Sequence, residues 1–484
     1  MPSKRACTIA GTVGFGLCKT AVSVAYMTAM GSVFSTVGFV SELDFMIPML
    51  VSSILTSAAI VTLVAFRKLS TGSLSQAPAV LALLLGFLLS ATGVLSSLPG
   101  TVLGALHGVL CGFALTVLNA VWLELFIAEA DSRCAVGQIV GGLAIQCVLS
   151  SLLPLLGPLG SSLLSIAAIS LSALLLGWLK RRVSFPANDD LLPRSRTDKL
   201  MLAQSYLCLF VLVGVVGILH TAVLGSQSEH LVGDVSMWMP LVAATIITAL
   251  VAGLTIRRPD PTAVYKGSLP AMLVILSLLP FLGHALGGLA GLVMITCYDV
   301  CGMVFLLFIV DRARALDVSG YALSSVYFGG SSLFLIIGLG LGGLLRTLSA
   351  DYGLSLLTLL AFAAIYPLAA ALIMVLKKPR ASSAVQQAES AQQQPADGDE
   401  KEAPSAQTVD DMLATGVDDI AERYGLTKRE REILGYLARG RSAKYISDTL
   451  VISDNTTWAH IKRIYAKTGV HSKQELMSLV EHQS

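Results

Sequence analysis

Residues 424–434, close to the C-terminus, read Tyr-Gly-Leu-Thr-Lys-Arg-Glu-Arg-Glu-Ile-Leu and carry the start signals of a helix. Thr427 stands at the cap position and Glu430 follows three residues later, so each side chain can bond to the other's backbone N–H. The apolar residues that follow share one helical face: Leu426, Ile433, Leu434 and Leu437. This stretch predicts the first helix of a small helical module.

Three further helices are predicted behind it. Ser442, Ser453 and Ser472 are suitable caps, and Glu475 completes a second capping box with Ser472. The second helix should run through Leu450, the third from Asp454 to about Thr468, where Gly469 stops it, and the fourth through Val480. The predicted inward side chains of the second and third helices are Ile446, Leu450, Ile461, Ile464 and Tyr465.

A spaced pattern runs through the module. Its elements are Leu426-Thr-x-Arg-Glu-x-Glu-Ile-Leu434, Ala438-x-Gly440, Ile446, Ile452-Ser453, Thr456, His460 and Tyr465-x-Lys467-x-Gly469-Val470-x-Ser472. The pattern closely resembles the LuxR-type DNA-binding domain, a helix-turn-helix with one flanking helix on each side. By that resemblance residues 424–484 form a DNA-binding domain whose third helix enters the major groove of double-stranded promoter DNA.

The resemblance assigns roles to particular residues. Lys462 is the expected base-edge contact, while Arg463 or Lys467 and also Lys444 are expected phosphate contacts. The other outward residues of the third helix are Asn455, Thr456, Trp458 and Ala459. Two positions depart from the family pattern, because Trp458 replaces a usual basic residue and Thr457 a core aliphatic one.

The module carries a net charge of +4 from ten Lys or Arg and six acids, which suits a weak monomeric contact with DNA. The fourth helix is the expected homodimer contact, through Leu476, Leu479 and Val480.

Upstream of the module, residues 381–423 are rich in Gln, Ala, Ser and acids and carry a net charge of −8. Such a segment has too little apolar surface to fold, which predicts a disordered acidic linker. Its last part, Val409–Arg423, has a weak helical periodicity that leaves open a short helix contacting the preceding domain.

The first 380 residues are far more apolar than a soluble protein. The whole chain is 54% hydrophobic and 13% charged, with a mean hydropathy of +0.75. Apolar runs of about 18–25 residues can cross a bilayer as helices. Twelve spans are predicted: Thr8–Phe34, Phe45–Phe66, Ala77–Leu98, Thr101–Ala128, Ala135–Leu156, Ser161–Leu179, Leu200–Leu224, Met237–Ile256, Ser268–Leu286, Gly287–Val310, Tyr321–Leu345 and Leu354–Leu376.

Charge between these spans alternates in phase with the predicted crossings. With the N-terminus inside, the inside segments hold nineteen Lys or Arg residues, whereas the outside loops hold only Arg346. Cytoplasmic loops retain positive charge, so both termini are predicted to lie on the cytoplasmic side of a bacterial cell membrane. Small residues in the spans, such as Gly338-x-Gly340-x-Gly342-Gly343, predict close helix approach or places where a helix bends.

The longest inside loop, Lys180–Lys199, divides the spans into halves of about 1–182 and 200–380. This all-α, 6 + 6 arrangement resembles the major facilitator superfamily, whose halves rock around a central cavity. That family's usual Gly and Asp-Arg motif between spans two and three is replaced here by Arg67-Lys68-Leu69-Ser70-Thr71-Gly72. The departure puts active transport in doubt more than the fold.

Ionisable and polar residues inside spans mark a possible ligand cavity, because buried charge in a bilayer is costly. The resemblance implies that spans one, four, seven and ten line such a cavity, and the candidates on them are Lys19, His107, Asn119, Glu124 and Asp299. The alternative is structural: Lys19 pairs with an acid, and Glu124 reaches water at the end of its span. Cys297 and Cys301 lie one helical turn apart, which permits a soft-metal site or ordinary packing.

Three functions compete at this point. The chain is a membrane-bound transcriptional regulator that senses a small molecule or membrane signal, or a secondary transporter with an appended regulatory domain, or a membrane enzyme. The last has little support, because the sequence offers no nucleophile–base–acid set and no metal cluster, and it indicates no cofactor. The regulator is the favoured interpretation, with an unidentified small-molecule ligand.

Overall fold

The structure is a computed structural model of the 484-residue chain. It describes residues 4–29, 42–92, 98–129, 132–152, 156–185, 190–224, 238–254, 261–353, 355–376, 416–438, 443–450, 454–470, 475–476 and 479–480. The chain divides into two compact units, Met1–Gln387 and Ala388–Ser484. Within the described residues the regular structure is helical, apart from an isolated bridge between Asp190 and Val318.

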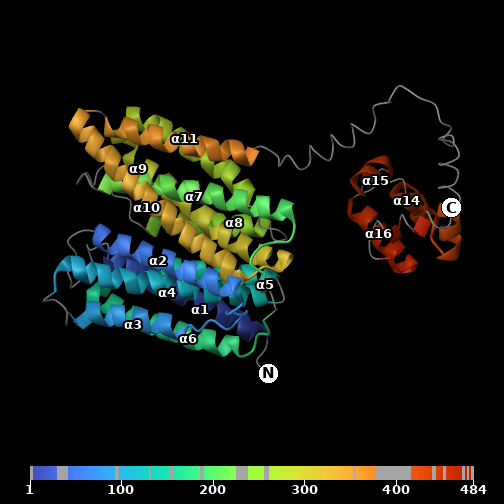
Figure 1. The fold of residues 1–484 in the computed structure, drawn as a ribbon, viewed down its shortest axis with the longest axis horizontal. Helices are drawn as coiled ribbons and strands as arrows, with labels where there is room; N and C mark the ends of the chain where they lie inside the picture. The colour runs from blue at the N-terminus through green and yellow to red at the C-terminus, as the bar shows by residue number, and fades with distance from the viewer. Residues whose placement is uncertain are drawn as a thin grey trace. The chain divides into compact units, whose positions relative to one another are not determined.

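Unit 1 is built from two groups of helices (Figure 1). The first group is α1 (Lys4–Ala29), α2 (Glu42–Ala65), α3 (Ala77–Thr92), α4 (Gly100–Ala128), α5 (Ser132–Leu152) and α6 (Gly157–Lys180). Within it, α1 packs against α5 and α6, and α4 packs against α2 and α3. The buried aromatic rings of Phe15, Trp122 and Phe126 meet between α1 and α4.

The second group is α7 (Arg196–Leu224), α8 (Trp238–Leu254), α9 (Pro261–Leu316), α10 (Gly320–Tyr352) and α11 (Leu356–Leu376). In it α7 packs against α10 and α11, and α9 packs against α8 and α11. The two groups meet mainly where α10 lies against α2 and α4 and where α5 lies against α8.

Nine segments within the described residues are helical, long and apolar enough to cross a membrane. Two of them, Pro261–Leu278 and Leu292–Leu316, belong to the single helix α9, so the predicted break between Leu286 and Gly287 falls inside helix. Two shorter apolar helices are Ala77–Leu88 and Leu241–Gly253. The polytopic all-α fold is confirmed, while the number of twelve crossings stays a prediction.

Glycines allow close helix approach, as the sequence predicts. A Cβ on Gly338 of α10 would overlap Gly214 O of α7, and one on Gly342 would overlap Ile218 O of the same helix. Gly340, between them, has nothing within 4 Å of where its Cβ would stand. Because Gly338 and Gly342 lie one helical turn apart and both touch α7, they mark one closely packed face of α10.

The two groups are also joined at the end of unit 1 where α4 and α6 finish. Arg314, near the end of α9, donates from Nε to Ile127 O at 2.8 Å and from Nη2 to Phe126 O. These carbonyls belong to the last turn of α4, where a helix lacks its own donors. Beyond α6, Ser319 N donates to Asp190 O at 2.9 Å, so the segment between the groups is tied to the start of α10.

The described part of unit 2 is a small helical module with its own core. It contains a helix over 416–423, α14 (Lys428–Ala438), α15 (Ala443–Leu450) and α16 (Asp454–Thr468), and residues 475–476 and 479–480 are also helical. The core is formed by Val417, Ile420, Ile433, Leu434, Leu437, Ala438, Ile446, Ile461, Ile464, Leu476 and Val480.

Candidate nucleic-acid interface

The capping box predicted at the start of α14 is present. Thr427 N donates to Glu430 Oε2 at 2.9 Å, and Glu430 N donates to Thr427 Oγ1 at 3.4 Å. This reciprocal pair satisfies two backbone donors that the first turn would otherwise leave unbonded. The predicted inward face is confirmed as well, because Ile433, Leu434 and Leu437 are all buried in the core.

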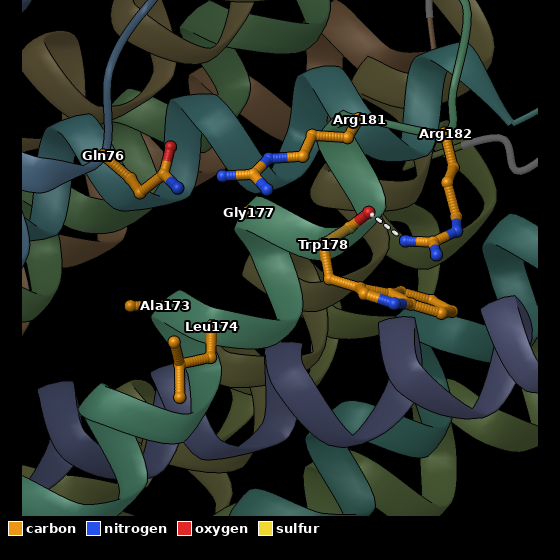
Figure 2. A pocket seen from close by; sticks show the side chains of 7 residues that line it. All are labelled: Gln76, Ala173, Leu174, Gly177, Trp178, Arg181 and Arg182. Carbon is orange, nitrogen blue, oxygen red and sulfur yellow. Dashed lines mark hydrogen bonds between the residues drawn. The ribbon is translucent and has the colours of Figure 1, made fainter.

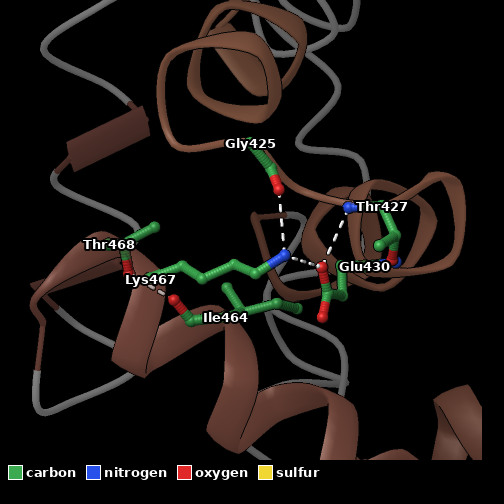
Figure 3. A network of polar contacts seen from close by, with 6 residues as sticks. All are labelled: Gly425, Thr427, Glu430, Ile464, Lys467 and Thr468. Carbon is green, nitrogen blue, oxygen red and sulfur yellow. Dashed lines mark hydrogen bonds and ion pairs between the residues drawn. The ribbon is translucent and has the colours of Figure 1, made fainter.

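A second contact fixes α14 to α16 (Figure 3). Lys467 Nζ donates to Glu430 Oε2 at 2.7 Å and to Gly425 O at 2.9 Å. The Glu430 side chain is only 3% exposed, whereas that of Lys467 is 36% exposed. Gly425 has a φ of +60°, a left-handed conformation that glycine adopts without strain. The turn before α14 therefore presents its carbonyl to the end of α16.

The charge on Glu430 is stabilised by these contacts. Burial alone would raise the pKa of the Glu430 carboxyl. The hydrogen bonds from Lys467 and Thr427 and the nearby ammonium charge lower this pKa by more than burial raises it. The net result is a pKa below the ordinary value for Glu. Glu430 is therefore ionised at neutral pH and acts as the acceptor at the junction of α14 and α16.

The exposed face of α16 carries most of the residues predicted to face DNA. Lys462, Arg463, Thr456 and Ala459 are exposed, and Trp458 is 55% exposed. Ile461 and Ile464 alternate with them on the buried side. The described part of α16 thus separates a basic outer face from an apolar inner face, the arrangement that a recognition helix needs.

The remaining residues of the predicted DNA-binding module do not all lie on this exposed face. Lys444 and Asn455 lie on α15 and α16, but their side chains are outside the described residues. Lys467, a predicted phosphate contact, spends two of its three donors on Glu430 and Gly425. Thr457, predicted at a core position, is fully buried. The capping serines Ser442, Ser453 and Ser472 lie outside the described residues.

The residues before the module differ from the predicted linker. Residues 416–423 form a helix whose Val417 and Ile420 enter the module's core, and Arg431 of α14 forms an ion pair with Asp418. The weak periodicity of Val409–Arg423 thus indicated a real helix from residue 416, and its contacts lie within unit 2. Residues 381–415, predicted to be a disordered linker, are outside the described residues.

The predicted dimer contacts need a correction. Leu476 and Val480 are completely buried in the module's own core, and Leu479 is half-buried against it. Side chains already packed inside one module have no surface left for a second copy. Leu479 alone of the three retains surface that a second copy can reach.

The predicted ligand-cavity residues are spread along unit 1. His107 is buried on α4 beside the Phe45 ring of α2, and a Cβ on Gly86 of α3 would contact it, so it faces α2 and α3. Glu124 is buried on the same helix, next to Gly320 at the start of α10. Seventeen residues of helix separate the two by about 25 Å.

The other three candidates have separate surroundings. Lys19 Nζ lies 5.5 Å from the Phe15 ring centroid, and Asn119 Nδ2 donates to Leu115 O of its own helix at 2.7 Å. Asp299 is half-buried on α9. The burial of Glu124 is the reverse of the alternative in which it reaches water, and the cavity itself stays a prediction. None of the eight cysteines, all of them described, forms a disulfide, and Cys297 and Cys301 are among them.

The fold and this face define a class of protein: a helix-turn-helix DNA-binding domain on the same chain as a polytopic helical membrane unit. Residues 424–480 match the family described as "Bacterial regulatory proteins, luxR family" (GerE). The module is therefore a LuxR-type helix-turn-helix domain, and the match leaves the first 423 residues outside it.

Curated proteins that are similar to this chain match it over a short stretch. The chain is 48% identical over 52 residues to the Fimbriae Z protein of Escherichia coli (strain K12), which is 11% of this chain and 25% of that protein. It is 45% identical over 53 residues to the monoamine regulon transcriptional regulator of Klebsiella aerogenes, 11% of this chain and 23% of that protein. The chain thus spans about a quarter of the length of these relatives.

Two membrane transporters are among the solved structures that are similar to this chain. The human organic anion transporter MFSD10 (TETRAN) matches with a TM-score of 0.49 and 13% identity, over 78% of this chain and 100% of that one. The major facilitator superfamily transporter FucP in the outward conformation matches with a TM-score of 0.44 and 13% identity, over 76% and 97%.

Proposed function

We propose that this chain is a membrane-bound transcriptional regulator. Its membrane unit senses a small molecule or membrane signal, and its C-terminal module binds promoter DNA. The observation that carries the proposal is the exposed face of Lys462 and Arg463 on α16 of a LuxR-type module that shares one chain with membrane-crossing helices. A DNA-binding domain gains little from a membrane anchor unless the membrane part supplies a signal.

In this proposal both termini lie on the cytoplasmic side of a bacterial cell membrane, because the basic loops alternate in phase with the crossings. Lys462 reads a base edge, Arg463 contacts phosphate, and Lys444, Asn455, Thr456, Trp458 and Ala459 complete the contact face. The protein is non-catalytic and acts as a homodimer. Of the three predicted dimer residues, Leu479 makes the dimer contact, because it is only half-buried in its own module.

Genome-wide DNA occupancy of the tagged full-length protein in its native membrane tests the proposal. We expect discrete sites for the wild type and their loss in a Lys462→Ala, Arg463→Ala double variant. A matched control is Lys428→Ala with Arg429→Ala, which removes the same charge from α14. Sites that persist in the α16 variant, or that vanish equally in the control, would contradict sequence reading by α16.

A second arm separates regulation from transport. Deletion of residues 1–380 should abolish the response of target genes to the signal while leaving the module able to bind its sites. An unchanged response without the membrane unit would exclude it as the sensor. Uptake of a labelled solute by vesicles, lost in Lys19→Met or Asp299→Asn, would instead support a transporter with an appended regulatory domain.

A further inference from the structure

A pocket of about 720 Å³ lies where α6 ends and α3 begins (Figure 2). It is lined by Gln76, Ala173, Leu174, Gly177, Trp178, Arg181 and Arg182. Arg181 and Arg182 directly follow the candidate membrane span Gly160–Lys180, so the pocket sits at the level where a crossing helix leaves the bilayer. None of the predicted ligand-cavity residues lines it.

The polar part of the pocket has one arginine that is already engaged and one that is available. The Arg182 guanidinium carbon lies 4.0 Å from the Trp178 ring centroid, and its Nη1 donates to Trp178 O at 3.2 Å. Arg181 instead extends across the pocket toward the Gln76 side chain. The Arg181 guanidinium makes no hydrogen bond or ion pair with another described residue, so its N–H donors face the pocket.

The other part of the pocket is apolar. Ala173, Leu174 and Gly177 lie one to two helical turns before the arginines, and Leu174 is 71% exposed. Gly177 has no side chain to fill the floor, and a Cβ there would stand 3.4 Å from Gln76 Nε2. An occupant therefore meets cationic and amide donors at one end and apolar surface at the hydrocarbon end.

We propose that this pocket binds the headgroup phosphate of an anionic phospholipid. Arg181 and Gln76 hold the phosphate oxygens, while Leu174 and the open floor at Gly177 accept the glycerol and the first acyl carbons. Basic pockets at the membrane boundary favour such headgroups. The lining holds no Asp or Glu to pair with an ammonium, which disfavours phosphatidylcholine and phosphatidylethanolamine. The inference needs unit 1 to lie in a bilayer and does not depend on DNA binding.

Native mass spectrometry of the full-length protein in detergent tests it, with phosphatidylglycerol and phosphatidylethanolamine added in equal amounts. We expect a preference for phosphatidylglycerol that falls about tenfold in Arg181→Gln, as loss of a charge-assisted hydrogen bond requires. Gly177→Leu should lower the same binding by filling the floor with no change of charge. Lys68→Gln removes a charge from an exposed residue outside the pocket and should leave binding at the wild-type level.

Thermal unfolding of each variant without added lipid separates lost binding from lost folding. If Gly177→Leu unfolds at a lower temperature than wild type, Gln76→Leu replaces it as the second pocket variant. Wild-type lipid preference in both Arg181→Gln and the folded second variant would overturn the proposal, as would an equal loss in Lys68→Gln. Displacement of phosphatidylglycerol by millimolar inorganic phosphate would identify a site for free anions and overturn the assignment to lipid.

Discussion

Lys467 Nζ lies 2.7 Å from Glu430 Oε2 and joins the last turn of α16 to the first turn of α14. The carboxylate is nearly inaccessible to water, so this ammonium and the Thr427 N–H replace its hydration. The contact spans 37 residues of sequence, so it holds the recognition helix in a fixed orientation against the rest of the module.

Replacing Lys467 with Met should therefore destabilise the module by about 1–3 kcal/mol, because a buried acceptor loses its partner. The measurement is urea unfolding of a fragment of residues 416–484, which contains every core residue of unit 2 that the structure describes. Lys462→Met removes the same charge from an exposed position and should change stability by less than about 0.5 kcal/mol. Equal stability of the two variants would show that the ion pair contributes nothing.

Stability of the same fragment should depend on pH through Glu430. The folded module lowers the pKa of this carboxyl, so its contribution is present above the ordinary pKa of Glu and is lost as pH falls through the folded value. We expect the urea midpoint to drop as the pH falls below the ordinary pKa of Glu and through the lower pKa of the folded module. In Glu430→Gln that drop should be smaller, and an identical pH profile would assign the dependence to other acids.

The packed face of α10 predicts a sharp contrast between neighbouring glycines. Gly338→Ala drives a Cβ into Gly214 O and should cost about 1–3 kcal/mol through overpacking. Gly340→Ala, two residues further, meets open space and should be neutral or stabilising by up to about 1 kcal/mol. Thermal unfolding of the full-length protein in detergent compares them. Equal melting temperatures would mean that α7 and α10 are not in close contact.

Lys462 and Arg463 of α16 should affect DNA binding in different ways. Arg463→Ala should weaken binding to all sequences alike and lower the salt dependence by about one phosphate contact. Lys462→Ala should relax the preference at one base step by about 1–3 kcal/mol. Fluorescence anisotropy with target and scrambled duplexes over a salt series measures both effects. If Lys462→Ala instead changed the salt dependence of binding and left the sequence preference unchanged, Lys462 would be the phosphate contact and not the base-edge contact.

Local signals in the sequence predict much of the module. The Thr427 and Glu430 capping box places the start of α14, and the apolar spacing identifies the buried faces of α14 and α16. The end of α16 is also set by a local signal, because Gly469 adopts a φ of +74° that glycine accommodates. These features depend on residues within a few positions of one another, which is the range that a sequence pattern covers.

The contacts that the sequence does not predict all depend on distant partners. A lysine in the last turn of α16 suits phosphate, but its ion pair with Glu430 depends on a residue 37 positions away in the sequence. Leu476 and Val480 are apolar enough for a contact, but the sequence does not say whether the partner is the same chain or a second copy. Likewise, Gln76 and Arg181 meet only because α3 and α6 lie side by side.

Trp458 has an optical consequence. The chain contains four tryptophans, and this one alone belongs to the DNA-binding module, where its indole stands on the outer face of α16. Indole emission responds to the exchange of water for a stacked or apolar neighbour. An isolated module therefore carries its own fluorophore on the surface that a duplex would cover, and its emission spectrum reports on docking without any attached label.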